Sequence, residues 1–158
     1  MIHLTLEPIT AEAFAPFGTL MPPQPGGTGR LDLIDELVNT RESAKPRLSI
    51  AAVTSKALPL VAVEMERHVH SSQAFVPLDG AEYLIMVAPH GPDGLPDMAG
   101  LRAFRVPGDT GINYRVDTWH HPLTALGEAG RFAVLTFVDG TAGDEQFVPL
   151  PEHVSIGA

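Results

Sequence analysis

Residues 60–78 read LVAVEMERHVHSSQAFVPL, an apolar run followed by a cluster of acidic and basic side chains. In an extended strand, successive side chains point to opposite faces. Glu64, Glu66, His68 and His70 are then expected on one face, and Arg67 on the other. Such a row is ordinary on a solvated sheet face, but inside a barrel it is costly unless the groups are paired or hold a ligand. The stretch therefore predicts either a solvated strand or a site that binds a metal or moves protons.

The rest of the chain indicates many short strands joined by tight turns. It contains 15 Gly and 15 Pro, and signals such as Asp79-Gly80 separate the apolar runs. We expect short helices over residues 11–16, with Thr10 as N-cap, and over 31–38. The tail at residues 151–158 is expected to be irregular. The expected strands are residues 2–6, 17–20, 47–53, 60–70, 73–78, 83–88, 101–106, 111–114, 131–139 and 147–150. This pattern predicts a mainly β fold, a small barrel or two-sheet sandwich, in a single domain spanning residues 1–158.

Composition restricts the classes of function. The chain of 158 residues is 44% hydrophobic and contains no Cys, so it can bury a core and forms no disulfide. Its net charge of −9 argues against nucleic acid and anionic membranes as partners. The N-terminus does not read as a signal peptide, and no apolar run approaches the roughly 20 residues that span a bilayer. An anionic small substrate stays compatible, because one Arg in a dry pocket can outweigh a screened surface field.

Two parts of the sequence resemble the cupin motifs. His68-x-His70, Gln73 and Gly80 stand where the first cupin motif places two His, an acid and a Gly, although Gln replaces the usual Glu. Pro107-Gly108 followed by His120 is similar to the second motif, in which one His completes a metal site. The resemblance implies a cupin-like barrel, also described as a double-stranded β-helix or jelly roll, with a metal held by His68, His70 and His120.

A more specific resemblance covers most of the chain. Residues 66–68 (ERH), 73–78 (QAFVPL), 111–114 (GINY) and 119–123 (WHHPL) resemble the ureidoglycolate lyase family, as do residues 6–10, 13–18 and 101–104. The resemblance implies a cytoplasmic homodimer that acts in allantoin and purine breakdown. The implied activity is that of a carbon–nitrogen lyase, which splits (S)-ureidoglycolate into glyoxylate and urea. It also implies a divalent metal, nickel or zinc. The family pattern has Pro after the motif His, where this chain has Val69.

This reaction requires three kinds of group. A base must take the substrate hydroxyl proton, an acid must protonate the departing urea nitrogen, and a cation or hydrogen-bond donor must hold the carboxylate. Glu66, His68 and His120 are the candidate catalytic proton carriers. Arg67 is the candidate carboxylate clamp, through two parallel hydrogen bonds, although strand parity places it opposite His68 unless a bulge intervenes.

Further residues are candidates for contacts with the substrate. Gln73, Asn113 and Tyr114 are expected to hydrogen-bond the ureido group, and Trp119 is expected to form an apolar wall. His120 and His121 are adjacent, so an extended chain turns only one of them inward, and we favour His120. His121 is included among the substrate-side residues with a partly structural role.

Two other functions compete with the lyase. The His68-x-His70 pair with His120 also fits a different metal cupin, such as a dioxygenase or a sugar-phosphate isomerase. A non-catalytic cupin that binds a small acid is the third reading, but no basic patch or DNA-binding segment supports a regulatory role.

Overall fold

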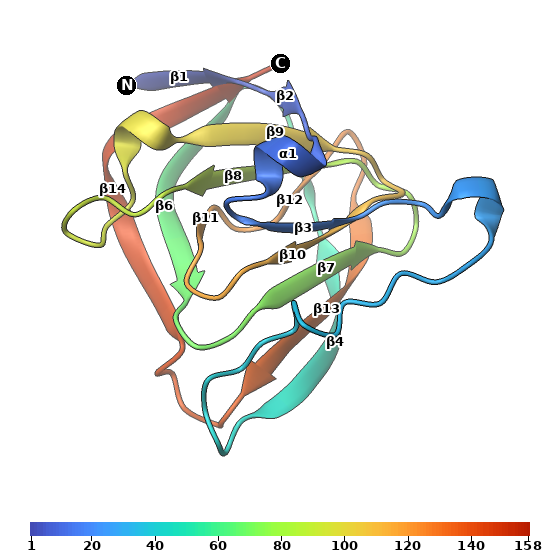
Figure 1. Cartoon of the computed structure of the whole chain (residues 1–158). Helices are drawn as coiled ribbons and strands as arrows, with labels where there is room; N and C mark the ends of the chain where they lie inside the picture. Colours follow the sequence, from blue (N-terminus) through green and yellow to red (C-terminus); the bar gives the residue numbers. More distant parts are fainter.

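The computed structural model describes residues 1–158 and consists mainly of β-strands arranged in two sheets (Figure 1). The larger sheet has nine strands, and its main path runs β1-β14-β6-β11-β8-β12-β5, with β9 joining β8 to β2. Its strands are β1 (Ile2–Thr5), β2 (Glu7–Pro8), β5 (Ser55–Lys56), β6 (Leu60–His68), β8 (Tyr83–Ala88), β9 (Arg102–Val106), β11 (Trp119–His120), β12 (Thr124–Leu126) and β14 (Glu145–Gly157).

The smaller sheet has five strands in the order β3-β10-β7-β13-β4. They are β3 (Gly18–Met21), β4 (Lys45–Val53), β7 (Gln73–Pro77), β10 (Gly111–Tyr114) and β13 (Gly130–Val138). All four pairings in this sheet are antiparallel, and β4 lies at its edge because it pairs only with β13. The mainly β expectation is confirmed.

Helices are few and short. The helix α1 (Ala11–Phe14) begins after Thr10, whose side-chain oxygen accepts from the backbone N–H of Ala13 at 3.1 Å, as expected for an N-cap. Two 3₁₀ turns, η1 (Pro25–Gly27) and η2 (Met98–Gly100), complete the set. None of the helices has the length and apolar character needed to cross a bilayer.

Two sequence-based expectations for secondary structure were wrong. Residues 31–38 form no helix, because Leu31, Leu33 and Leu37 instead line an apolar groove with residues of the smaller sheet. The tail is not irregular, because β14 continues to Gly157. In this strand Val154 and Ile156 alternate into the core, and the strand pairs with both β1 and β6.

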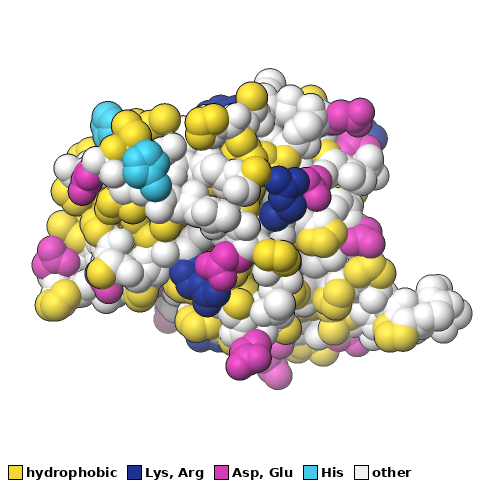
Figure 2. Space-filling model, turned by 90° about the horizontal axis from the view of Figure 1, so that it is seen from above, with side chains coloured by type: hydrophobic (Ala, Val, Ile, Leu, Met, Phe, Trp, Pro, Cys, Tyr) yellow, Lys and Arg dark blue, Asp and Glu magenta, His cyan; other side chains and the backbone are white.

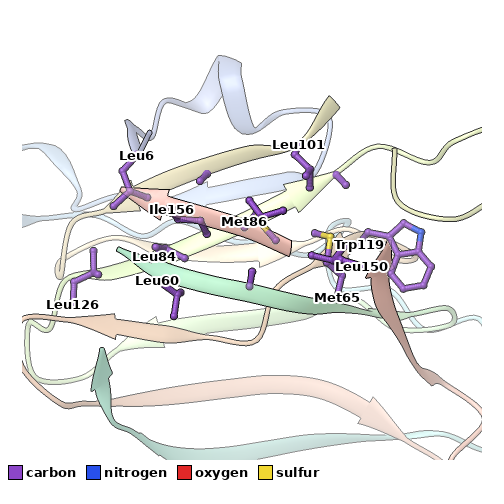
Figure 3. Close-up of a cluster of buried hydrophobic side chains, with 14 residues drawn as sticks. Leu6, Leu60, Met65, Leu84, Met86, Leu101, Trp119, Leu126, Leu150 and Ile156 are labelled. Atoms are coloured by element: carbon purple, nitrogen blue, oxygen red, sulfur yellow. The ribbon is translucent and has the colours of Figure 1, made fainter. Parts of the chain in front are cut away.

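Two apolar clusters lie on opposite faces of the larger sheet, and β8 contributes to both. Tyr83, Ile85 and Val87 belong to a cluster that joins the two sheets, while Leu84 and Met86 belong to the other cluster. Figure 3 shows this second cluster, which is formed by the larger sheet and the segments that cover it. Every residue of β8 is buried, as its continuous apolar sequence predicts.

An irregular pairing changes which face the residues of β6 occupy. The register between β14 and β6 shifts between Pro149, opposite Glu64, and Val154, opposite Ala62. Ala62 and Met65 therefore lie in the same apolar cluster although they are three residues apart. After the shift, Glu66 and His68 point away from Met65 and toward the space between the sheets.

The molecular surface mixes charges of both signs. On the face shown in Figure 2, acidic and basic side chains are interspersed among apolar ones, and no continuous basic patch is visible.

Candidate active site

Three side chains from two neighbouring strands of the larger sheet form a compact cluster. Glu66 and His68 come from the end of β6, and His120 of β11 pairs directly with Glu66. Their potential ligand atoms all lie within 4.8 Å of one another. His120 Nε2 lies 3.3 Å from Glu66 Oε1, and the His68 and His120 rings are nearly parallel with centroids 6.0 Å apart. The cluster brings together one carboxylate and two imidazoles.

Glu66 and His68 open into a pocket of about 580 Å³ that residues of both sheets line. Its apolar side includes Phe75, Leu123 and Val134, and its polar side includes Gln73 and Thr136. The other lining residues are Arg41, Arg47, Ser49, Ile50, Ala51, Phe137, Val138, Thr141, Ala142, Asp144 and Glu145. This volume easily holds a small organic acid.

The tautomer of His120 follows from its surroundings. Its Nδ1 lies 2.9 Å from the carbonyl oxygen of Thr118, which can only accept, so Nδ1 carries the ring proton. Nε2 of the neutral ring then presents a lone pair toward Glu66. The ring stacks on Tyr114 with centroids 4.2 Å apart, which fixes its plane. Two acceptors that face each other at 3.3 Å need a proton or a cation between them.

The donor set fits a divalent metal. His68 Nε2 and His120 Nε2 are buried side-chain atoms without a hydrogen-bond partner, and both belong to the cluster. Imidazole nitrogen and carboxylate oxygen are ordinary ligands for zinc and other first-row divalent metals. The structure therefore supports a metal-binding triad without identifying the metal.

Opposing effects determine the ionisation of Glu66. Burial raises the pKa of its carboxyl, but the close contact with His120 and the charges of His120 and His68 outweigh burial, so the pKa lies below its usual value. Glu66 is therefore ionised at neutral pH. The pKa of the neighbouring Tyr114 is raised by burial, so its phenol stays neutral.

The structure places the expected metal ligand His70 outside the cluster. The strand β6 ends at His68, and the chain bends at Val69 and His70, so the alternation of faces stops there. His70 Nδ1 instead lies 2.8 Å from Thr40 Oγ1. The set of candidate ligands changes accordingly from His68, His70 and His120 to Glu66, His68 and His120.

Arg67 and Trp119 also lie away from the pocket. The guanidinium of Arg67 stacks over the Trp119 ring at 4.5 Å, and it binds Gln146 and Asp117. Trp119 is fully buried in the apolar cluster of Figure 3 and donates its indole N–H to the carbonyl oxygen of Gly94. Strand parity explains both positions, because Arg67 follows Met65 on its face and Trp119 points opposite to His120.

The remaining substrate-side candidates are divided. Gln73 lines the pocket, and its Oε1 is buried without a partner. Asn113 points to a different hollow and donates to the carbonyl oxygen of Glu36. The Tyr114 ring stacks on the His120 ring and does not line the pocket. His121 is buried beside the site, contacts the carbonyl oxygen of Pro122, and has a pKa lowered to about 4 by burial.

Several residues that line the pocket were not predicted from the sequence. Arg47 and Ser49 lie on the inward face of β4, and Asp144 precedes β14. The alternation in β4 gave no usable signal, because the apolar Leu48 and Ile50 would be expected to face the core, yet both are exposed. Arg47 is also exposed although it lines the pocket. Asp144 lies in a Gly- and Asp-containing turn, where no periodic pattern predicts the direction of a side chain.

Comparison with known proteins gives a consistent result. A family model described as ureidoglycolate lyase matches residues 1–156. A putative ureidoglycolate lyase of Agrobacterium fabrum is 36% identical over 99% of this chain and 96% of its own length. The ureidoglycolate lyase of Burkholderia mallei is 37% identical over 94% and 91%, and that of Brucella melitensis is 38% identical over 84% and 81%.

A solved structure supports the architecture. The crystal structure of a dTDP sugar isomerase from Desulfovibrio desulfuricans superimposes with a TM-score of 0.51, covering 85% of this chain and 83% of that one. The sequence identity is 16%, so the likeness concerns the fold alone. The expected cupin-like barrel is confirmed.

Proposed function

Because the chain belongs to the ureidoglycolate lyase family, we propose that it splits ureidoglycolate into glyoxylate and urea in the pocket around Glu66, His68 and His120. The observation that supports this location is the cluster of these three groups at a pocket between the two sheets, where Glu66 and His68 line the pocket and His120 lies buried behind Glu66. The reaction moves one proton from the substrate hydroxyl to the departing nitrogen, while the C–N bond breaks and the carbonyl forms.

The pair of Glu66 and His120 is suited to this proton movement. Ionised Glu66 accepts the hydroxyl proton, and His120 protonated at Nε2 donates to the urea nitrogen as it leaves. After the step, Glu66 carries the proton that His120 has lost. The two atoms are 3.3 Å apart, so transfer between them restores the starting state.

Arg47 is the best-placed group for the substrate carboxylate. The pocket contains two arginines, and Arg41 is already engaged with Asp139, Asp144, Ser71 and the carbonyl oxygen of Phe137. Arg47 has no ion pair or hydrogen bond within the chain, and it lies opposite Thr136 on the inward face of β4. A free guanidinium in a pocket can bind a carboxylate through two parallel hydrogen bonds. Gln73 Oε1 is then available to accept from the ureido N–H groups.

A divalent metal held by Glu66, His68 and His120 would act as a Lewis acid on the substrate oxygens, in place of proton exchange between Glu66 and His120. The metal mode requires a bound ion, whereas proton exchange between Glu66 and His120 does not. Turnover after dialysis against a chelator, followed by addition of nickel or zinc, distinguishes them. Full activity of the metal-free protein supports the proton-exchange mode, and activity that returns only with metal supports the metal mode.

The products test the function itself. Purified protein should release urea and glyoxylate in equal amounts from ureidoglycolate, measured by separate assays for each. Release of ammonia in place of urea would assign the chain to the amidohydrolases, and absence of any turnover with or without metal would contradict the lyase.

We further propose that two copies associate through the outer face of the smaller sheet. An apolar groove lies there, and one of the residues that line it, Leu48 of β4, is strongly exposed. Other residues that line the groove are Met21, Leu33, Leu37, Val76 and Leu135. The strand β4 has a free edge, and an antiparallel edge strand can pair with its own copy about a two-fold axis. A second copy of the chain is therefore the occupant that fits this face.

A further inference from the structure

Asp144 is a buried carboxylate that contacts the end of β6 in three ways. Its Oδ1 accepts from the backbone N–H of His70 at 2.6 Å, and its Oδ2 lies 3.3 Å from His68 Nδ1. Its backbone oxygen accepts from the N–H of Val69 at 2.9 Å. Asp144 therefore meets each residue from His68 to His70, at the point where β6 ends and the candidate site begins.

Arg41 holds this carboxylate in place. Its Nη2 lies 3.6 Å from Asp144 Oδ2 and also donates to Ser71 Oγ and to the carbonyl oxygen of Phe137. Its Nη1 lies 3.4 Å from Asp139. The Arg41 side chain is only 12% exposed, so its position is restricted. The guanidinium compensates the charge of Asp144, which would otherwise be costly to bury.

The contact with Asp144 determines the chemistry that His68 offers to the pocket. An ionised carboxylate only accepts hydrogen bonds, so the neutral His68 ring carries its proton at Nδ1, facing Asp144. Its Nε2 then presents a lone pair, and this atom is buried without a hydrogen-bond partner. His68 belongs to the cluster with Glu66 and His120, and Nε2 is the ring nitrogen left free for it. The carbonyl oxygen of Thr118 has the same effect on His120. In metal sites, the second ring nitrogen of a ligating histidine commonly donates its proton to a carboxylate or carbonyl oxygen in the same way.

We propose that Asp144, anchored by Arg41, is a positioning residue that fixes His68 as the Nδ1–H tautomer and directs the Nε2 lone pair into the pocket. The inference builds on the site proposed above, but it concerns the state of one ring and does not depend on which substrate is cleaved.

The variant Asp144→Asn tests the proposal because the contact of Oδ1 with the His70 N–H, at 2.6 Å, is much closer than that of Oδ2 with Arg41 Nη2, at 3.6 Å, and so decides the orientation of the new amide. The backbone N–H of His70 requires an oxygen at the Oδ1 position, so the new NH₂ group takes the place of Oδ2. This NH₂ faces His68 Nδ1 and can only donate, which favours the opposite tautomer with the proton at Nε2. A donor then points into the pocket in place of a lone pair.

Long-range ¹H–¹⁵N correlation spectra of the metal-free protein, recorded at mildly alkaline pH, report the tautomer of each His. We expect Nδ1–H for His68 in the wild type and Nε2–H in Asp144→Asn, with the Nδ1–H signal of His120 unchanged as an internal reference. An Nε2–H signal for His68 in the wild type would overturn the proposal without any variant, as would an unchanged tautomer in Asp144→Asn.

Nickel binding measured by calorimetry gives a second readout. We expect Asp144→Asn to weaken Ni²⁺ affinity by about 10- to 100-fold. The matched control is Asp139→Asn, which also removes a carboxylate from Arg41 but leaves the contact with His68 intact, so its affinity should stay near the wild type. Equal losses in both variants would assign Asp144 a merely structural role. If the protein failed to cleave ureidoglycolate, the proposed function would fall while the tautomer result would stand.

Discussion

At the scale of single residues, Glu66 and His120 are the side chains on which the proposed chemistry depends most. We expect Glu66→Gln and His120→Ala each to lower kcat by about 10²- to 10⁴-fold, because each removes one positioned proton carrier. Circular dichroism should show an unchanged fold. The control is His90→Ala, which removes a His that binds the carbonyl oxygen of Asp117 outside the pocket. Wild-type turnover in both site variants would remove the pair from the mechanism.

Substitutions of Arg47 and Arg67 are expected to have different effects on KM. Arg47→Met should raise KM for ureidoglycolate more than it lowers kcat, with kcat/KM falling by about 10- to 100-fold for the loss of a charged hydrogen-bonded contact. Arg47→Lys should recover part of this loss, because a point charge replaces a two-pronged donor. Arg67→Met serves as the matched variant and should leave KM nearly unchanged, since Arg67 stacks on Trp119 away from the pocket. Steady-state kinetics of the three variants decide between them, and a KM increase confined to Arg67→Met would restore Arg67 as the clamp.

At the scale of elements, β14 stabilises the larger sheet because it pairs with both β1 and β6. Val154 is fully buried in this strand, whereas Val61, opposite its neighbour Ser155, is 46% exposed. We expect Val154→Ala to lower the free energy of unfolding by about 2 kcal/mol, from the lost apolar burial and the cavity left behind. Val61→Ala should change it by less than about 0.5 kcal/mol. Denaturant titration measures both, and equal effects would show that β14 does not form the core expected of it.

The ion pair between Glu7 of β2 and Arg102 of β9 should make a pH-dependent contribution to the free energy of unfolding. Glu7 accepts from Arg102 through both carboxylate oxygens, and this hydrogen bonding lowers the pKa of Glu7. A lowered folded-state pKa stabilises the protein above the unfolded-state value, and this contribution is lost as the pH falls through the folded-state value. The wild type should therefore exceed Glu7→Gln in stability at pH 7 by less than about 1 kcal/mol, because the pair is partly exposed, and the difference should shrink as the pH falls through the folded-state pKa of Glu7. A difference that is constant with pH would contradict the ion pair.

The sequence predicted individual elements well where one periodicity was uninterrupted. The continuous apolar run 83–88 and the alternating run 47–53 became strands β8 and β4, and Thr10 became the cap of α1. The prediction failed at residues 31–38. The spacing of their apolar side chains suits a helix, but these side chains lie against the smaller sheet instead. It also extended β6 to His70, whereas the strand ends at His68, because the chain bends at Val69 and His70 and the alternation in the sequence does not show this bend.

At the scale of the whole molecule, the pocket exists only because two sheets come together. Glu66 and His68 belong to one sheet, while Gln73 and Arg47 belong to the other. The strand alternation was enough to group Glu66 with His68, and the family resemblance pointed to His120. Arg47 and Asp144 could not be predicted in the same way, because their approach to the site depends on contacts between distant segments. The resemblance identified the family more readily than physical reasoning located its binding residues.

The outer face of the smaller sheet leads to a prediction about assembly. Leu48 is 71% exposed on the edge strand β4 and lines the apolar groove together with Leu33 and Leu37. A charge at this point would have to be buried without a partner if two copies pack there, and such burial is costly. Sedimentation velocity should therefore show a dimer for the wild type and a monomer for Leu48→Glu. The control Leu95→Glu changes another exposed leucine, in the loop before η2, and should remain dimeric. A dimer that persists in Leu48→Glu would move the interface to another face, and a monomeric wild type would refute the association.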